Sequence, residues 1–189
     1  MADMSSLMSS GFASLSLTTI TSSLISVQQL ITASAWLMGI SFVVKAIYSM
    51  KSVAEQKTQQ SSHGSLKEPL FYLLAGAMLI YLPTAVHIFL NSTFGEGAQI
   101  LAYAPLDSGN STLNKLFGQS SSLGPIIALV VQVVGVIAFI RGWVLIARSA
   151  SQGQQPGGVG KGLAHVFGGI LAMNIVGTLQ IVNNTLFGS

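Results

Sequence analysis

Residues 126–140 read IIALVVQVVGVIAFI, a stretch without a charged side chain, and this stretch decides the fold. With its flanks it forms an apolar segment from about Gly124 to Ala147. Core helices and strands of soluble proteins do not need an apolar run of this length, whereas a helix that crosses a bilayer needs roughly 20 apolar residues. The segment therefore predicts a membrane-spanning helix.

The composition of the whole chain also indicates that the protein resides in a lipid bilayer. Of its 189 residues, 50% are hydrophobic and only 7% are charged, against about 25% charged residues in soluble domains. The formal charge is +3, but the cations are spread thinly and form no basic stripe, so contact with nucleic acid is not indicated. Because the sequence has no cysteine, disulfides, thiolate catalysis and cysteine-based zinc sites are excluded.

Three further segments predict membrane spans. The first covers about residues 27–50, centred on WLMGISFVV, and the second covers about residues 69–90. The fourth span of the chain, about residues 162–182, is richer in glycine and less hydrophobic. Together with residues 124–147, these segments predict an all-α membrane protein with four transmembrane helices.

Cations gather in and beside two connectors, residues 51–68 between the first two spans and residues 148–161 between the last two. Seven of the eight Lys and Arg residues lie there: Lys45, Lys51, Lys57, Lys67, Arg141, Arg148 and Lys161. Short loops rich in Lys and Arg stay in the cytoplasm. We therefore expect both connectors inside, and the central loop and both termini on the outer, periplasmic side.

Residues 1–26 lack the basic start and the compact apolar segment of a signal peptide, so we expect them to stay attached. Their pattern of Ser, Thr, Leu and Met is compatible with an amphipathic helix in the outer membrane interface or against a partner. An outward extension of the first span is the alternative.

The two halves of the chain resemble each other. The aligned segments are GISFVVK at 39–45 with GVIAFIR at 135–141, the glutamines near 56–60 with those near 152–155, Ala75-Gly76 with Gly168-Gly169, and NSTFG at 91–95 with NTLFG at 184–188. Chance similarity between apolar segments is the alternative. Aligned basic residues, glutamines and Phe-Gly pairs favour a true repeat, because they are not generic hydrophobicity.

The repeat predicts the arrangement of the spans. An even number of spans separates the aligned positions, so both halves have the same orientation in the membrane. We therefore predict two tandem, parallel-oriented helical hairpins, residues 27–95 and 124–189. Residues 96–123, rich in Ser, Gly and Asn, are expected to form a linker between them on the outer side.

Lys45 and Arg141 occupy aligned positions near the cytoplasmic ends of the first and third spans. A charge there is costly unless it extends to the interface or faces a polar cavity. Two interpretations are open. Both side chains reach phospholipid headgroups, or both line a conduit in an oligomer.

Small residues recur at four-residue spacing in the second half, which places them on one helix face. They are Gly160, Ala164, Gly168 and Ala172 in the fourth span, and Ala138 and Gly142 in the third. Such faces let two helix backbones approach closely. They can pack within the chain or against neighbouring subunits.

Four further residues interrupt the apolar spans. Pro83 kinks the second span and frees backbone carbonyl groups. Gln132, Asn174 and Gln180 place amides inside spans, where hydrogen bonding across helices is the usual role.

No set of residues predicts catalysis, a metal site or a cofactor site. His87 and His165 lie near the ends of their spans, which contain no acidic partner for a proton relay. The glycine-rich connector resembles a phosphate-binding loop superficially, but it has Gln155 and Gly162 where the Walker pattern needs Gly and Ser or Thr. A flexible connector is the plain interpretation.

Four stretches carry a resemblance to a known family: MADMSSLMSSGF at 1–12, WLMGISFVVKAIYSM at 36–50, GQQPGGVGKGLAHVFGG at 153–169 and NNTLFGS at 183–189. Together with the rest of the chain they resemble the IcmC/DotE family, small inner-membrane proteins of the Dot/Icm (type IVB) secretion system, with relatives in conjugation systems of IncI-type plasmids.

The resemblance implies a bacterial inner-membrane component of an apparatus that moves effector proteins into a host cell. Its partners would be other secretion-system membrane subunits and phospholipid, with effectors contacted only indirectly. Each two-span hairpin with a basic cytoplasmic tip also looks like a type IV secretion pilin. We expect a non-enzymatic structural subunit of an oligomeric channel or pilus-like assembly; a stand-alone small channel or transporter is the alternative.

Overall fold

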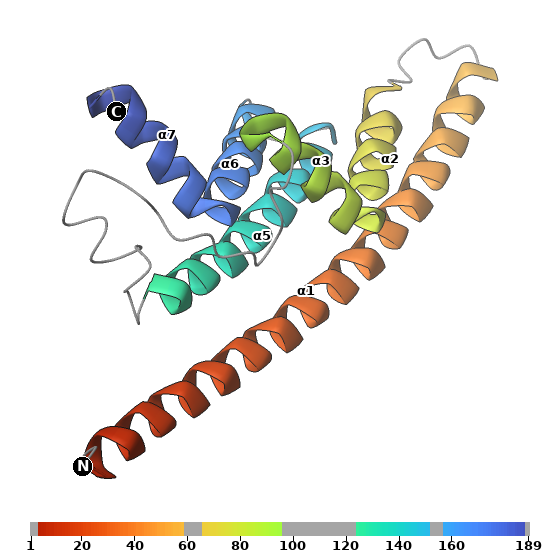
Figure 1. Cartoon of the computed structure of the whole chain (residues 1–189). Coiled ribbons are helices and arrows are strands. Elements are labelled where there is room, and N and C mark those ends of the chain that lie inside the picture. Colours follow the sequence, from red (N-terminus) through yellow and green to blue (C-terminus); the bar gives the residue numbers. More distant parts are fainter. Residues whose placement is uncertain (1–3, 59–65, 96–123, 152–156, 188–189) are drawn as a thin grey trace.

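The computed structural model describes residues 4–58, 66–95, 124–151 and 157–187, and within these ranges the ordered elements are helices (Figure 1). They are α1 (Met4–Thr58), α2 (Lys67–Ile80), α3 (Leu82–Phe94), α5 (Gly124–Ser149), α6 (Gly158–Met173) and α7 (Ile175–Phe187). The predicted linker at 96–123 and parts of both connectors lie outside the described residues.

Two helices are each long and apolar enough to cross a membrane, namely residues Ser22–Gln56 of α1 and the whole of α5. The prediction of an all-α protein with membrane-spanning helices is confirmed at this level. No proline interrupts residues 4–58, so α1 continues without a break. Residues 4–26 therefore belong to the same helix as the first predicted span.

The second and fourth predicted spans are each divided into two helices at a sharp bend, whereas the sequence predicts only a kink at Pro83 in the second span. α2 and α3 meet at an angle of 89°, and α6 and α7 meet at 93°. With 14 residues, α2 is about 21 Å long, shorter than the roughly 30 Å of a bilayer core. The described chain thus has two full-length candidate spans, or four if each bent pair counts as one.

Different local features produce the two bends. Pro83 is the second residue of α3, where its missing N–H is harmless and its fixed φ suits the start of a helix. In the other hairpin, Asn174 Oδ1 accepts a hydrogen bond from the Gly177 N–H at 3.1 Å. Gly177 is the third residue of α7, so Asn174 caps that helix. The predicted hydrogen bond from Asn174 across helices is therefore replaced by a cap.

Each long helix approaches the following short helix at a pair of glycines. A Cβ placed on Gly39 of α1 would lie 2.9 Å from the carbonyl oxygen of Gly76 in α2. A Cβ placed on Gly169 of α6 would lie 2.7 Å from the carbonyl oxygen of Gly135 in α5. Both distances are shorter than ordinary contacts, so glycine is what allows the backbones to come this close.

These glycine pairs match the sequence repeat. Gly135 follows Gly39 by 96 positions, and Gly169 follows Gly76 by 93. We call residues equivalent when they are related by these offsets, 96 between α1 and α5 and 93 between α2–α3 and α6–α7. The bends, at Tyr81 and at Asn174, are equivalent as well. Hairpin 1 (α1–α3) and hairpin 2 (α5–α7) therefore share both their packing and their bend.

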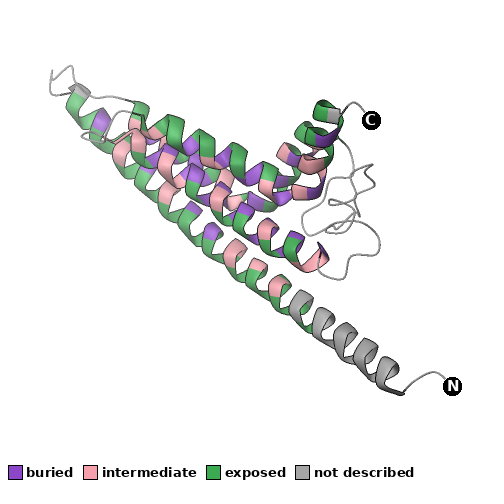
Figure 2. Cartoon of the chain, turned by 90° about the vertical axis from the view of Figure 1, so that its left-hand side faces the viewer, coloured by how far each residue is buried: buried purple, intermediate pink, exposed green. Residues whose placement is uncertain are grey.

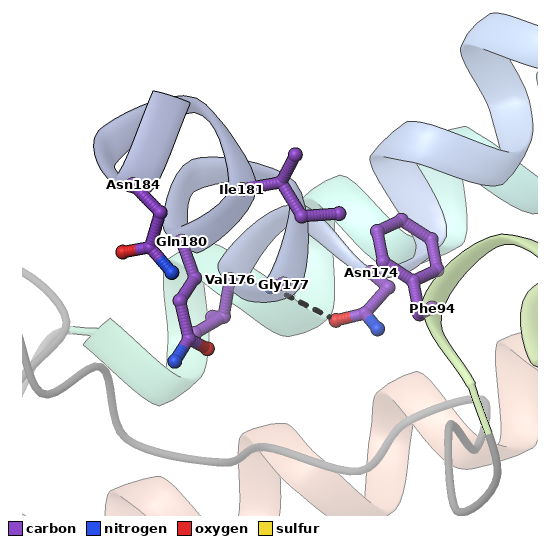
Figure 3. Close-up of a pocket in the computed structure, with 7 residues that line it drawn as sticks. All are labelled: Phe94, Asn174, Val176, Gly177, Gln180, Ile181 and Asn184. Carbon is purple, nitrogen blue, oxygen red and sulfur yellow. Dashed lines mark hydrogen bonds between the residues drawn. The ribbon is translucent and has the colours of Figure 1, made fainter. Parts of the chain in front are cut away.

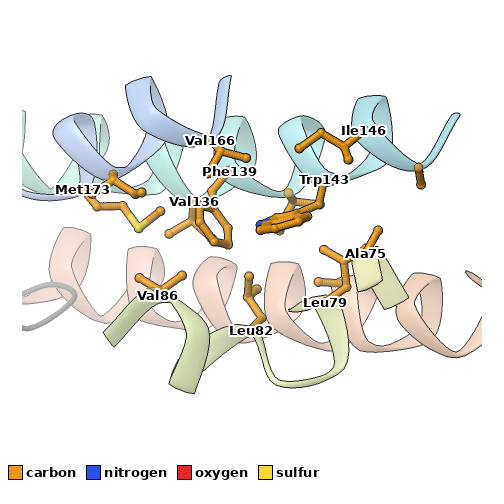
Figure 4. Close-up of a cluster of buried hydrophobic side chains, with 14 of the residues drawn as sticks. Ala75, Leu79, Leu82, Val86, Val136, Phe139, Trp143, Ile146, Val166 and Met173 are labelled. Atoms are coloured by element: carbon orange, nitrogen blue, oxygen red, sulfur yellow. The ribbon is translucent and has the colours of Figure 1, made fainter. Parts of the chain in front are cut away.

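One continuous apolar core joins the two hairpins (Figure 4). Phe139 of α5 is fully buried, and its ring meets the ring edges of Phe89 at 5.7 Å and Trp143 at 6.2 Å between centroids. Leu79 and Leu82 cover it from α2 and the start of α3. Because lipid is as apolar as leucine, this contact is stabilised by close packing rather than by exclusion of water. Figure 2 shows that burial is concentrated where the hairpins meet, while much of α1 is exposed.

Candidate functional site

A chain of polar side chains connects the two hairpins near the start of α2. Lys45 Nζ donates to Tyr72 Oη at 2.7 Å and lies 4.2 Å from the centre of the tyrosine ring. Tyr72 Oη lies 2.9 Å from Ser151 Oγ, which donates to Glu68 Oε1 at 3.2 Å. Ser151 follows α5, so a residue of hairpin 2 bridges two residues of hairpin 1.

One set of hydrogen positions satisfies all three contacts. Lys45 donates to Tyr72, Tyr72 donates to Ser151, and Ser151 donates to the Glu68 carboxylate. This series of hydrogen bonds then runs from a cation to an anion, an arrangement in which each hydrogen bond strengthens the next. Tyr72 is 2% exposed, and the ring of Phe42 packs edge-on at 5.5 Å, so the hydroxyl that links the two charges is held firmly in place.

The two aligned cations have different surroundings. Lys45 is engaged with Tyr72, a within-chain partner that neither sequence interpretation included. Arg141 lies on α5 and is exposed, as is the Lys45 side chain. Contact of either side chain with headgroups or a conduit stays a prediction.

The predicted small residues divide into two groups. A Cβ on Gly142 would lie 2.7 Å from the carbonyl oxygen of Gly162, so Gly142 packs within the hairpin as expected. By contrast, no heavy atom of the described residues lies within 4 Å of a Cβ placed on Gly160 or Gly168. Among the described residues, these two glycines therefore have no within-chain neighbour on this side of α6. The rest are exposed (Ala164) or half-buried (Ala138, Ala172).

Apart from Gly142, the glycines that pack within the chain, Gly135, Gly162 and Gly169, were not singled out from the sequence as contact residues. Gly135 and Gly142 of α5 are seven residues apart, and so are Gly162 and Gly169 of α6. A seven-residue spacing keeps small residues on one seam of two adjacent helices. This spacing is the signal that identifies them, whereas the four-residue spacing identified the opposite side of α6.

Two hollows lie beside the two bends. The first, of about 360 Å³, carries amide side chains of Asn174, Gln180 and Asn184 beside the start of α7 (Figure 3). The second, of about 620 Å³, lies between α1 and the α2–α3 bend and includes Thr32 and Pro83. The residues equivalent to these two, Ala128 and Val176, are buried together in hairpin 2. The equivalence of the hairpins therefore ends at the bends.

Within the described residues, no group of three His, Asp or Glu side chains is placed to hold a metal ion. The polar chain through Tyr72, the glycine contacts and the open small-residue side of α6 are thus the features that distinguish this molecule. No family model, no curated protein and no solved structure matches the chain.

Proposed function

We propose that the chain is a non-enzymatic structural subunit of the inner membrane, which acts by packing its helices into an oligomeric channel or pilus-like assembly. The resemblance of its sequence to the IcmC/DotE family leads us to place this assembly in a type IVB secretion apparatus. Export of effector proteins would then depend on this chain as a building block, with other subunits supplying energy and substrate recognition.

The equivalent packing of the two hairpins carries the proposal. Both hairpins close on a glycine pair in which each backbone would contact a Cβ on the other at 3.0 Å or less. Such contacts use small residues to bring helices together and leave no room for a bound substrate between them. A molecule made twice from the same tightly packed unit is suited to repetitive assembly.

Isolation of the native particle tests the proposal. The protein, tagged at its own chromosomal locus, is extracted from membranes in mild detergent, and the co-purifying proteins are identified by mass spectrometry. We expect a large particle that contains other secretion-system membrane subunits. Recovery of the chain alone, or only as a small homo-oligomer, would contradict the proposal.

A stand-alone channel or transporter is the second candidate, and the bent helix pairs favour it. Transporters place substrate sites at interrupted helices, and the hollow beside Asn174 and Gln180 lies at such an interruption. The parallel repeat permits a transporter, and the amide side chains in this hollow carry no charge. The substrate class that they favour is therefore a small uncharged solute. If the chain is a stand-alone channel or transporter, vesicles that contain only this chain should take up solute. If the chain is a structural subunit, they should show no solute flux.

A further inference from the structure

We infer that the chain associates with further copies of itself head to tail. Hairpin 2 of one copy would hold α1 of the next copy in the way that hairpin 1 holds α5 within the chain. The inference rests on the oligomer in the proposed function and names the two surfaces that meet. It follows from the hairpin equivalence, because each hairpin carries both a surface that holds a helix and a helix that can be held.

The side of α5 that hairpin 1 covers has an open counterpart on α1. On α5, Val136, Ile140 and Trp143 belong to the core that joins the hairpins, and these three and the nearby Val133 are each at most 8% exposed. The equivalent α1 residues, which we call the α1 ridge, are Leu37 (60% exposed), Ile40 (36%), Val44 (45%) and Ile47 (59%). Each of these four buried α5 positions thus has an exposed apolar equivalent in α1.

The surface that holds α5 also has an open counterpart. In hairpin 1 it includes Phe42, Phe71, Ala75 and Leu79, all of which belong to the core between the hairpins. The equivalent residues of hairpin 2, which we call the α6 groove, are Ala138, Ala164, Gly168 and Ala172. They are small, and a Cβ on Gly168 would meet no described atom within 4 Å. This groove has room for the larger side chains of an α1 ridge.

Charge complementarity identifies a second copy, rather than lipid alone, as the occupant. Within the chain, Ser151, which follows the end of α5, contacts Tyr72 and Glu68 beside Lys45. The residues equivalent to Ser151, Lys45, Tyr72 and Glu68 are Glu55, Arg141, His165 and Lys161. The next copy would therefore place its Glu55 beside Arg141 and Lys161 of the first copy. Within the chain, the Ser151 hydroxyl makes the corresponding contact between the hairpins.

The two surfaces differ from each other, so the interface is heterologous. An interface of this type does not stop at two copies, because each added copy presents a free α6 groove or a free α1 ridge. Repetition gives a closed ring or an open filament, depending on the rotation between successive copies.

Disulfide cross-linking in membranes tests the interface, and the natural chain offers a background without cysteine. Two differently tagged copies are co-expressed, one with Ile47→Cys and the other with Gly168→Cys, since the equivalents of these residues, Trp143 and Ala75, belong to the same core. We expect oxidation to join the two differently tagged copies through a disulfide between positions 47 and 168. The matched control replaces Ile47→Cys by Ser52→Cys, an exposed position on another side of α1, and should give at least ten-fold less product.

Two outcomes would overturn the inference. One is the absence of the 47–168 product, and the other is efficient 47–47 or 168–168 product, which indicates a two-fold interface instead. Charge exchange provides the second measurement. Arg141→Glu should reduce the 47–168 product several-fold, and Glu55→Arg in the partner copy should restore it; failure of this rescue would contradict the proposed charge contact.

The cross-link and the native particle can fail separately. A chain that gives the 47–168 product but purifies without other secretion-system subunits self-associates as inferred, while its assignment to the apparatus is wrong. A chain that purifies with those subunits but gives no 47–168 product belongs to the apparatus, while the head-to-tail interface is wrong.

Discussion

Gly168 and Gly169 are neighbours on α6 for which the structure predicts opposite responses to the same substitution. A Cβ on Gly169 would lie 2.7 Å from the Gly135 carbonyl oxygen and 2.8 Å from the Phe139 nitrogen. Both neighbours are backbone atoms and cannot rotate away. Ordinary contact begins at about 3.4 Å, so α5 and α6 must separate locally by about 0.7 Å. A Cβ on Gly168 meets no described atom.

The steric cost follows from this difference. Forcing extra volume into a packed contact costs about 1–3 kcal/mol. Replacement of a mid-helix glycine by alanine gains about 0.5–1 kcal/mol from helix propensity, and this gain is common to both positions. It cancels when the two variants are compared, so Gly169→Ala should be less stable than Gly168→Ala by about 1–3 kcal/mol, which corresponds to about 5- to 150-fold in the folding equilibrium.

Reversible unfolding in detergent micelles, with SDS as denaturant, measures this difference. Each variant is studied at a dilution at which the chain is monomeric, so that self-association does not contribute. Fluorescence follows Trp143, which is buried between the hairpins, and a Trp36→Phe background removes the signal of the exposed tryptophan. Equal destabilisation by Gly168→Ala and Gly169→Ala would refute the packing described here.

Three further predictions concern polar residues. Tyr72→Phe removes two hydrogen bonds and should lower the free energy of unfolding by about 1–3 kcal/mol in the same assay; an unchanged value contradicts a role of the polar chain in joining the hairpins. Asn174→Ala removes the cap of α7 and should cost about 0.5–2 kcal/mol, with faster hydrogen exchange at the Gly177 amide, whereas unchanged exchange there argues against capping. Charge reversal of both Lys45 and Arg141 should stop effector export while the protein stays in the membrane; normal export would refute a role of these charges.

The two long helices could be predicted because their signal is local. A long, predominantly apolar segment without a proline in its interior is sufficient for a helix that spans a bilayer, whatever it packs against. This is the case for α1 and α5. The internal repeat could be predicted for a similar reason, since aligned glycines and cations are visible in the sequence without knowledge of their contacts.

The bends could be predicted only in part. Pro83 marks the break between α2 and α3, although the bend is at Tyr81, two residues earlier. Asn174 gives no such signal, because an asparagine inside an apolar segment can bond across helices or cap a new helix. The choice depends on whether the backbone turns there, and in the folded chain the turn goes together with the packing of Val176 against Ala128.

The side of α6 that packs could not be identified from spacing alone. Glycine and alanine occur at four-residue spacing on one side and at seven-residue spacing on the other, and both patterns permit close helix contact. The partner decides between them. Gly135 and Gly142 on α5 match the seven-residue series, a comparison that needs both helices at once. The hydrogen bond from Lys45 to Tyr72 was missed for the same reason, since it joins residues from two helices.

Distances between spin labels measure directly whether the two hairpins are equivalent. One variant carries labelled cysteines at Ser41 and Leu74, and the other at their equivalents, Ile137 and Phe167, all of which are exposed. Pulsed electron paramagnetic resonance on each variant in lipid bilayers then gives one distance for each hairpin. Equal mean distances are the predicted result. Mean distances that differ by more than the width of the distributions would contradict the equivalence.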